Sequence, residues 1–399
     1  MKTAALAFPT PEDDIPNILH AVRTHLGMQV GFVSRFHCGQ RYFLHVSADH
    51  NAPIQEGMGD PLEESYCQRI VDGRLPQLMT DARTHPEAAS MKVTHELPVG
   101  AHLSIPIVLQ DGEIYGTFCC FSHHAEPNLN DRDLQVMRAF AELARERIEH
   151  QRQAQQHFEL RKKRIEQVLF EQHYRMVFQP IVHLTSGEMV GVEALSRFTL
   201  PPQQTPDVWF KEARDVQLGT ELELAVCLRA LHDFQHLPED VFLAINFSPE
   251  VLLDPKTHEV FSHAPLDRMV LEVTEHDRIP DYPELQGCLQ AFREQGLKLA
   301  IDDAGAGYAS MQHVLQMQPD ILKLDIALTR GIDQSRQKQA LTSALVMYAQ
   351  QMNTDVIAEG IETPEELHTL QKLGVVYGQG YLLGRPQPVR DLLQTHLSK

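Results

Sequence analysis

The sequence predicts an α+β domain built on an antiparallel sheet with helices, then a long linker helix, then a TIM-like (β/α)8 barrel with one antiparallel strand. Three observations support this fold class. The first part mixes strand-like runs with a favoured hairpin turn, the middle contains almost no Gly or Pro, and the last part alternates strand-like and helical segments. A chain of 399 residues is long enough for two globular domains. We expect these domains at residues 14–128 and 173–399, with the helical linker at residues 129–172.

Composition and charge limit the kinds of partner. With 43% hydrophobic residues, no apolar run near the ~20 residues that cross a bilayer and no export signal, we expect a cytoplasmic protein without a membrane span. The 54 acidic and 35 basic residues give a net charge of -19, which disfavours binding to DNA or RNA polymers. A small phosphorylated ligand is compatible with this charge if metal ions supply positive charge.

The first part contains the strand-like runs QVGFVSRF, YFLHVSA and two more within LSIPIVLQDGEIYGTFCCFS. Asp111 and Gly112 form a favoured hairpin dipeptide between the last two strands. The six cysteines of the chain form no CxxC pair, so we expect reduced thiols that mainly fill the core. At Cys67 a pigment attachment point is the alternative, but no supporting motif accompanies it.

One long helix is expected from Asn130 to about Gln172, with Asn130 or Asp131 as its N-cap. Its heptad a and d positions are apolar at both ends and polar in the middle. These positions hold Leu134, Met137, Ala141, Ala144, Ile148, Gln151, Gln155, Phe158, Lys162, Ile165 and Leu169. A dimerising coiled coil, and hence a homodimer, is the interpretation that this pattern favours. A single helix packed against its own domains at each end is the alternative.

Eight strand-like runs make up the last part, and most of them lead into a helical segment. They are MVFQPIV, EMVGVEAL, VFLAINFS, RMVLEVTE, LKLAIDD, DILKLDI, DVIAEG and VYGQGYLLG. Alternation of strand and helix implies a parallel sheet. Residues 185–187, between the first two runs, are too few for a crossover helix, so these two strands should pair antiparallel. Eight strands suggest a closed barrel.

Alternation along the predicted strands turns polar side chains toward the barrel interior. In ILKLDI the apolar residues share one face, which leaves Lys323 and Asp325 facing inward. The same alternation turns inward Glu193, Asn246, Glu272 and Glu359. In barrels of this class, the rim at the carboxyl ends of the strands is where chemistry takes place.

Too many acids meet at this rim to be explained as ordinary ion pairs. The five carboxylates are Glu193, Glu272, Asp302, Asp303 and Glu359, and Lys323 is the one inward cation that we identify. Crowded like charges oppose folding unless a cation neutralises them. Oxygen ligands of this kind, with the Asn246 carbonyl, suit Mg²⁺ or Mn²⁺. Two such ions would activate a water and clamp a phosphodiester for in-line attack.

The last part resembles the EAL-type cyclic di-GMP phosphodiesterases. GVEALSRF contains their signature, and FQPIV, NFS, LEVTE, DDAGAGYASM, LKLD, IAEGIET and QGYLLGRP occur in the family's order. The resemblance extends from Tyr174 to Pro388. It implies metal-dependent hydrolysis of cyclic di-GMP to linear pGpG, with two divalent ions, Mg²⁺ or Mn²⁺, at each active site.

The resemblance also implies roles for individual residues. Metal ligands would be Glu193, Asn246, Glu272, Asp302, Asp303 and Glu359. Catalytic residues would be Lys323, Glu193, Asp303, Glu359 and Gln379, with Lys323 stabilising the attacking water and the phosphate charge. Substrate contacts would be Gln179, Leu195, Arg197, Asp325, Glu362 and Pro386, with Arg197 on a phosphate. Glu275 would anchor the loop after Asp303.

The first part resembles GAF sensor domains in ESYCQRIVDGRLP and GAHLSIPIVLQDGEIYGTFCCF. This resemblance implies control of the barrel through the long helix, and it leaves open an unknown small ligand in the sensor. No segment resembles a GGDEF cyclase, so synthesis of the nucleotide is not expected.

One departure from the EAL pattern lies in the loop after the two aspartates. Where the family usually has Asp-Asp-Phe-Gly-Thr-Gly, this chain has Ala304 and Ala306 in place of the Phe and Thr. The alternative function is therefore a catalytically weak or inactive receptor that binds cyclic di-GMP without cutting it.

Overall fold

The computed structural model describes residues 14–48, 53–274, 279, 281–304 and 308–396. The chain divides into two compact units, Met1–His157 and Phe158–Lys399. Among the described residues, no helix combines the length and the apolar character that crossing a membrane requires.

The first unit is built on a six-stranded antiparallel sheet in the order β3-β2-β1-β6-β5-β4. The strands are β1 (Val30–His37), β2 (Gln40–Ala48), β3 (Gly59–Pro61), β4 (Leu78–Met79), β5 (His102–Val108) and β6 (Ile114–Phe121). The short helices are α1 (Asp14–His25), α2 (Tyr66–Val71), α3 (Pro86–Ser90) and α4 (Lys92–Glu96). The predicted hairpin is confirmed, since Gly112 adopts a positive φ of 85° between β5 and β6.

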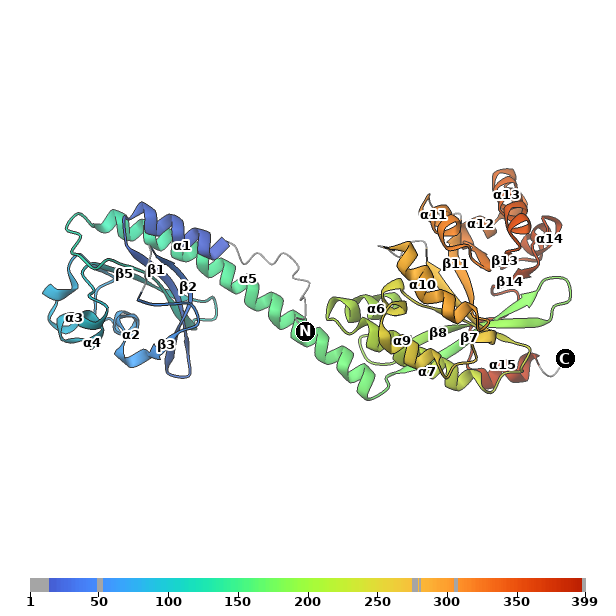
Figure 1. The fold of residues 1–399 in the computed structure, drawn as a ribbon, viewed down its shortest axis with the longest axis horizontal. Helices are drawn as coiled ribbons and strands as arrows, with labels where there is room; N and C mark the ends of the chain where they lie inside the picture. Colours follow the sequence, from blue (N-terminus) through green and yellow to red (C-terminus); the bar gives the residue numbers. More distant parts are fainter. Residues whose placement is uncertain (1–13, 49–52, 275–278, 280, 305–307, 397–399) are drawn as a thin grey trace. The chain divides into compact units, whose positions relative to one another are not determined.

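Two apolar cores cover the two faces of this sheet. One contains α1 and the start of α5 (Asp131–Phe170), and the other contains α2 (Figure 1). Neighbouring cysteines on β6 separate accordingly, with Cys120 in the first core and Cys119 in the second. This separation follows from the alternation of side chains along a strand.

Helix α5 is continuous over 40 residues, as the sequence predicts. Asn130 precedes its first residue, and the Asn130 Oδ1 atom accepts a hydrogen bond of 3.0 Å from the Arg132 amide. The apolar ends of the heptad pattern are used within the chain. In the core of the first unit lie Met137, Ala141, Ala144 and Ile148. Ile165 lies in the core of the second unit. The two ends of the helix therefore pack against the domains of their own chain, which is the alternative to a coiled coil.

The second unit is a closed barrel in the order β10-β11-β12-β13-β14-β7-β8-β9. Its strands are β7 (Tyr174–His183), β8 (Met189–Phe198), β9 (Phe242–Asn246), β10 (Met269–Thr274), β11 (Lys298–Ala304), β12 (Ile321–Leu324), β13 (Asp355–Ala358) and β14 (Tyr377–Gly378). Strand β7 is antiparallel to both β8 and β14, and the remaining neighbours are parallel. The predicted inverted strand is thus β7.

Helices surround the barrel (Figure 1). They are α6 (Pro206–Asp215), α7 (Gly219–Phe234), α8 (Pro249–Leu252), α9 (Pro255–Phe261), α10 (Tyr282–Arg293), α11 (Tyr308–Met317), α12 (Ile326–Thr329), α13 (Arg336–Met352), α14 (Pro364–Lys372) and α15 (Val389–His396). Inside the strands lies a small apolar layer formed by Ile181, Ala244, Val270, Ala300, Ile321 and Ile357.

Candidate functional site

The polar rim stands directly above the apolar layer inside the barrel. Five strands carry a polar residue two positions beyond a residue of that layer, which places both on the same side of the strand. The rim residues found in this way are Asn246, Glu272, Asp302, Lys323 and Glu359. Side-chain alternation therefore brings together, at one end of the barrel, groups from five separate segments of the chain.

Lys323 lies at the centre of the rim and is fully buried. Its Nζ atom is 2.8 Å from a Glu359 oxygen and 2.9 Å from a Glu272 oxygen. The same atom is 3.4 Å from Asp302 and 3.7 Å from Glu193. One ammonium group thus contacts four carboxylates.

Two amide side chains join the acids to one another. Gln379 Nε2 donates to Glu193 at 2.6 Å and to Glu359 at 3.0 Å. Asn246 Nδ2 donates to Glu193 and to Glu272, both at 3.3 Å. Among the described residues, the buried Gln379 Oε1 atom has no hydrogen-bond partner. An unsatisfied buried acceptor of this kind is a suitable partner for a water or a cation.

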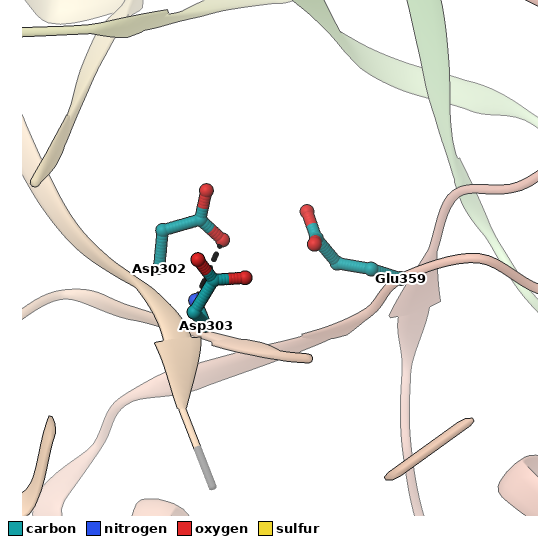
Figure 2. Close-up of side chains that lie close together, drawn as sticks. All are labelled: Asp302, Asp303 and Glu359. Carbon is teal, nitrogen blue, oxygen red and sulfur yellow. Dashed lines mark hydrogen bonds between the residues drawn. The ribbon is translucent and has the colours of Figure 1, made fainter. Parts of the chain in front are cut away.

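Asp302 and Asp303 approach Glu359 at the ends of β11 and β13, as Figure 2 shows. Ligand oxygens of these three residues lie within 4.8 Å of one another. Asp303 has a positive φ of 57°, and its amide donates to Asp302 Oδ1 at 2.9 Å. The left-handed turn lets two consecutive acids face one point, although side chains alternate along a regular strand.

Burial and mutual repulsion perturb the acids of the rim. Burial raises the pKa of Glu359 to about 8; the charges of Asp302 and Glu193 add to the shift, and Lys323 opposes it. Burial, followed by the charge of Asp302, raises the pKa of Asp303 to about 6.

Glu272 and Lys323 are perturbed in the same direction. The pKa of Glu272 lies well above its usual range, mainly because of burial and against the effect of Lys323. Burial alone would lower the pKa of Lys323, but the surrounding carboxylates raise it well above its usual value.

The donor set fits a hard divalent cation. Carboxylate and amide oxygens are the ligands that Mg²⁺, Mn²⁺ and Ca²⁺ prefer. Four rim carboxylates surround the single Lys323 ammonium, so the acids outnumber the positive charge that contacts them. Asp302, Asp303 and Glu359 have the spacing to share one ion.

A cavity of about 340 Å³ lies beside the rim. It is lined by Gln179, Ile326, Arg330, Glu359, Gly360, Glu362, Gln379, Gly380 and Tyr381. Of the predicted substrate contacts, the structure thus places Gln179 and Glu362 at the cavity. Gln179 is held by a hydrogen bond of 3.2 Å to the Gly384 carbonyl.

The remaining predicted contacts, Leu195, Arg197 and Pro386, are half-buried and lie outside the lining of this cavity. Leu195 and Arg197 belong to β8, where Arg197 Nη1 donates to the Ser196 carbonyl at 2.7 Å.

The prediction that Asp325 lies on a strand was wrong. Strand β12 ends at Leu324, and Asp325 is the N-cap of α12, where it accepts a hydrogen bond of 2.6 Å from the Ala327 amide. Asp325 caps the helix and does not continue the strand, because an Asp side chain readily accepts hydrogen bonds from the free amides at the start of a helix. Its carboxyl group still hydrogen-bonds Asp303.

Two predicted features fall on residues outside the described part of the chain. They are Glu275, expected to anchor the loop, and Ala306. Ala304 is described and is fully buried at the end of β11.

Sequence reasoning missed Arg330. This residue lines the cavity and forms an ion pair with Glu362. It follows α12, where no strand alternation reaches, so its position depends on the path of the chain after β12. A basic residue shortly after the LKLD motif was the only available signal.

Comparison with known proteins identifies relatives of both units. An EAL domain model matches residues 162–386, and a GAF domain model matches residues 10–149. The chain is 30% identical over 233 residues to the probable cyclic di-GMP phosphodiesterase PdeD of Escherichia coli K12. The aligned region covers 56% of this chain and 43% of PdeD. It is 32% identical over 233 residues to the cyclic di-GMP phosphodiesterase PA2567 of Pseudomonas aeruginosa. That alignment covers 54% of this chain and 39% of PA2567.

The chain thus spans less than half the length of these curated relatives. Among solved structures, the PaMucR phosphodiesterase in complex with c-di-GMP matches with a TM-score of 0.53 at 26% identity. That match covers 59% of this chain and 100% of the PaMucR chain.

Proposed function

This chain belongs to the EAL domain family, whose model matches more than half of its residues, and on this premise we propose that it hydrolyses cyclic di-GMP to linear pGpG with divalent metal ions. Relatives named as cyclic di-GMP phosphodiesterases support the substrate. The observation that carries the proposal is the rim itself, in which four carboxylates surround one buried lysine.

The rim residues divide into metal ligands and a proton-holding group. We propose that two ions, Mg²⁺ or Mn²⁺, are held by Glu193, Asn246, Glu272, Asp302, Asp303 and Glu359. When bound, such ions lower the pKa of a water and neutralise phosphate charge. Lys323 keeps its proton because of the surrounding acids, so it donates hydrogen bonds to the attacking water and to a phosphate oxygen. Gln379 orients Glu193 and Glu359.

The cavity beside the rim is the proposed site for the nucleotide. Glu362, opposite Arg330, is suited to accept hydrogen bonds from a guanine edge, and Gln179 supplies an amide. Arg197 offers a guanidinium for a phosphate. Leu195, Asp325 and Pro386 are proposed as further contacts on the strength of the family resemblance alone.

Control is proposed to come from the first unit. Helix α5 begins in the GAF unit and ends in the barrel unit, so it is the covalent route for a signal. A homodimer is proposed as well, on the strength of the heptad pattern in the sequence of this helix.

A turnover assay tests the proposal directly. The full chain with cyclic di-GMP and Mg²⁺ or Mn²⁺ should release pGpG, and Asp302→Asn should abolish release. Asp355→Asn is the matched control, because Asp355 is exposed at the opposite end of the strand that leads to Glu359. Absence of product from folded protein at every metal concentration would refute hydrolysis.

A receptor is the second candidate, favoured by the buried Ala304 where the family carries a bulkier residue. Isothermal titration beside the turnover assay separates the two functions. A receptor binds cyclic di-GMP and releases no product.

A further inference from the structure

Two cysteine side chains meet in the core of the first unit. Cys67 lies on α2 and Cys119 on β6, 52 positions later, and both are fully buried. Their Sγ atoms are 3.7 Å apart. A disulfide bond measures about 2.04 Å, so the two sulfurs would have to approach by roughly 1.7 Å to form one.

The surroundings of this pair are polar, although the core is apolar. Arg41 Nη1 donates to Cys67 Sγ at 3.1 Å. The Thr117 hydroxyl hydrogen-bonds both sulfurs, 3.0 Å from Cys67 and 3.1 Å from Cys119. The Ser104 hydroxyl is 3.0 Å from Cys119. A thiol that merely fills space needs none of these partners.

Arg41 is itself built into the core. It is 3% exposed, its guanidinium pairs with Asp60 on β3, and it lies over the Phe43 ring at 4.7 Å. A positive charge is therefore held against Cys67 in a region of low dielectric constant, where it strongly stabilises a thiolate.

The two sulfurs differ in acidity. Burial would raise the pKa of the Cys67 thiol, but hydrogen bonding by Cys119 and the charge of Arg41 lower it to about 6. Burial and the neighbouring Cys67 raise the pKa of Cys119 well above its usual value. In contrast, burial raises the pKa values of Cys120 and Cys227 to about 12.

A small cavity lies beside Arg41, and neither cysteine is among its lining residues. Its volume is about 20 Å³, and its lining includes Arg41, Tyr66 and His102. His102 is 2% exposed, and its Nδ1 atom has no hydrogen-bond partner among the described residues. A cavity of this size holds a water-sized polar molecule, whereas ligands of drug size occupy about 300 Å³ or more.

We propose that Cys67 and Cys119 form a peroxide-reactive dithiol, in which Cys67 is the attacking sulfur and Cys119 the resolving one. The Cys67 thiolate attacks one oxygen of hydrogen peroxide, the O–O bond breaks, and hydroxide leaves as Cys67 becomes a sulfenic acid. Cys119 sulfur then attacks Cys67 sulfur, its proton neutralises the hydroxide that departs from the sulfenic acid, and the disulfide forms. The proton that Cys67 lost on ionising neutralises the first hydroxide, so overall two thiols are oxidised to one disulfide and one peroxide is reduced to two waters.

The disulfide would tie α2 to β6 and remove the sulfur charge that Arg41 faces. This modification goes beyond the proposed hydrolysis and is independent of it. Its test needs no turnover measurement.

The test treats the reduced full chain with hydrogen peroxide, alkylates free thiols at intervals and maps the cysteine peptides by mass spectrometry. A reducible peptide pair linking Cys67 to Cys119 should accumulate before the exposed Cys38 is oxidised. Reduction should restore both thiols. Oxidation of Cys38 while Cys67 and Cys119 are still recovered as alkylated, unoxidised thiols would overturn the proposal. This comparison needs no variant.

Variants separate the two roles. Cys119→Ser should leave a sulfenic acid on Cys67 that dimedone traps, and Cys67→Ser should lose both dimedone labelling of the pair and the cross-link. Cys120→Ser is the matched control, since Cys120 is the equally buried neighbour on the other sheet face. The Cys67–Cys119 cross-link should still form in this variant. Arg41→Gln should slow formation of the cross-link. Equal dimedone labelling of Cys67 and Cys119 in the single variants would contradict the assigned order.

Discussion

Lys323 is the residue on which the balance of charge at the rim depends. Its ammonium group contacts Glu193, Glu272, Asp302 and Glu359 without access to solvent. Removal of this ammonium group would leave the four acids with no cation in contact among the described residues, and such losses are strongly destabilising.

Lys323→Met should therefore abolish turnover and lower the free energy of unfolding of the metal-free protein by about 3–5 kcal/mol. Added Mn²⁺ should recover much of the lost stability but none of the turnover, because the hydrogen-bond donor to the water and phosphate stays absent. Urea unfolding in chelator and in Mn²⁺, beside a product assay, measures both effects. A variant as stable as the wild type in chelator would contradict this account of the rim.

The raised acid pKa values predict how metal binding depends on pH. Between its usual pKa near 4.5 and its folded-state pKa of about 8, Glu359 binds more protons in the folded chain than in the unfolded chain. The metal-free protein should thus lose stability as the pH rises through that window. Lys323, with its raised pKa, keeps its proton throughout it.

Because metal ions replace the protons of these acids, the gain in melting temperature on adding Mn²⁺ should grow from about pH 6 to about pH 9. Thermal unfolding with chelator and with Mn²⁺ at both pH values measures this gain. A gain that is largest at the lower pH would show that the acids do not bind the ion as proposed.

At the scale of single elements, helix α14 holds the loop that carries Glu362. Thr363 and Glu366 form a capping box, and the buried Glu366 carboxylate also accepts from the Gly331 and Glu362 amides. One side chain thus joins the start of α14 to the segment after α12. Its backbone hydrogen bonds lower the pKa of Glu366 against the effect of burial.

Glu366→Ala should destabilise the chain by about 2 kcal/mol, since several amides lose their acceptor. The same change should raise KM for cyclic di-GMP more than it lowers kcat, because Glu362 lines the proposed nucleotide cavity and is proposed only as a substrate contact. Glu365→Ala on the same helix turn is the control, as Glu365 is exposed. Denaturation and steady-state kinetics check the two effects, and equal results for both variants would contradict the role of the cap.

At the scale of the whole molecule, the barrel includes the last turns of α5. Ile165 and Val168 are fully buried in its core. Arg164 lies over the Trp209 ring at 5.0 Å and pairs with Glu212, and Trp209 stacks on Phe198 at the end of the strand that carries Glu193. The end of the helix is thus part of the barrel unit, and Trp209 beside it contacts the end of one of the strands.

A fragment of residues 158–399 should consequently be more stable than one of residues 174–399, which lacks the buried face of α5. The loss of two buried aliphatic side chains should cost about 3–6 kcal/mol. Melting temperatures of the two fragments test this, and turnover by the longer fragment compared with the full chain reports control by the first unit. Equal melting temperatures would show that the helix end contributes nothing to the barrel.

Much of the fold and of the rim followed from local patterns. The period of two along the strands identified Glu193, Glu272 and Glu359 as inward residues, and a short connection identified the antiparallel pair. The same rule failed at Asp325, where helix capping replaced the strand, and it could not reach Arg330 in the segment beyond. A heptad pattern in α5 likewise did not distinguish burial within the chain from burial in a partner.

By itself, the sequence determined the order of the barrel strands, the family that the barrel resembles and the acids that face its interior. These features depend on neighbours one to four positions apart and on the alternation that backbone geometry imposes. Only the tertiary structure decided that Lys323 contacts four acids at once, that Arg330 faces Glu362 and that Cys67 lies beside Cys119. Such distances join residues far apart in the chain, and closure of the barrel and packing of helices on the sheets set them.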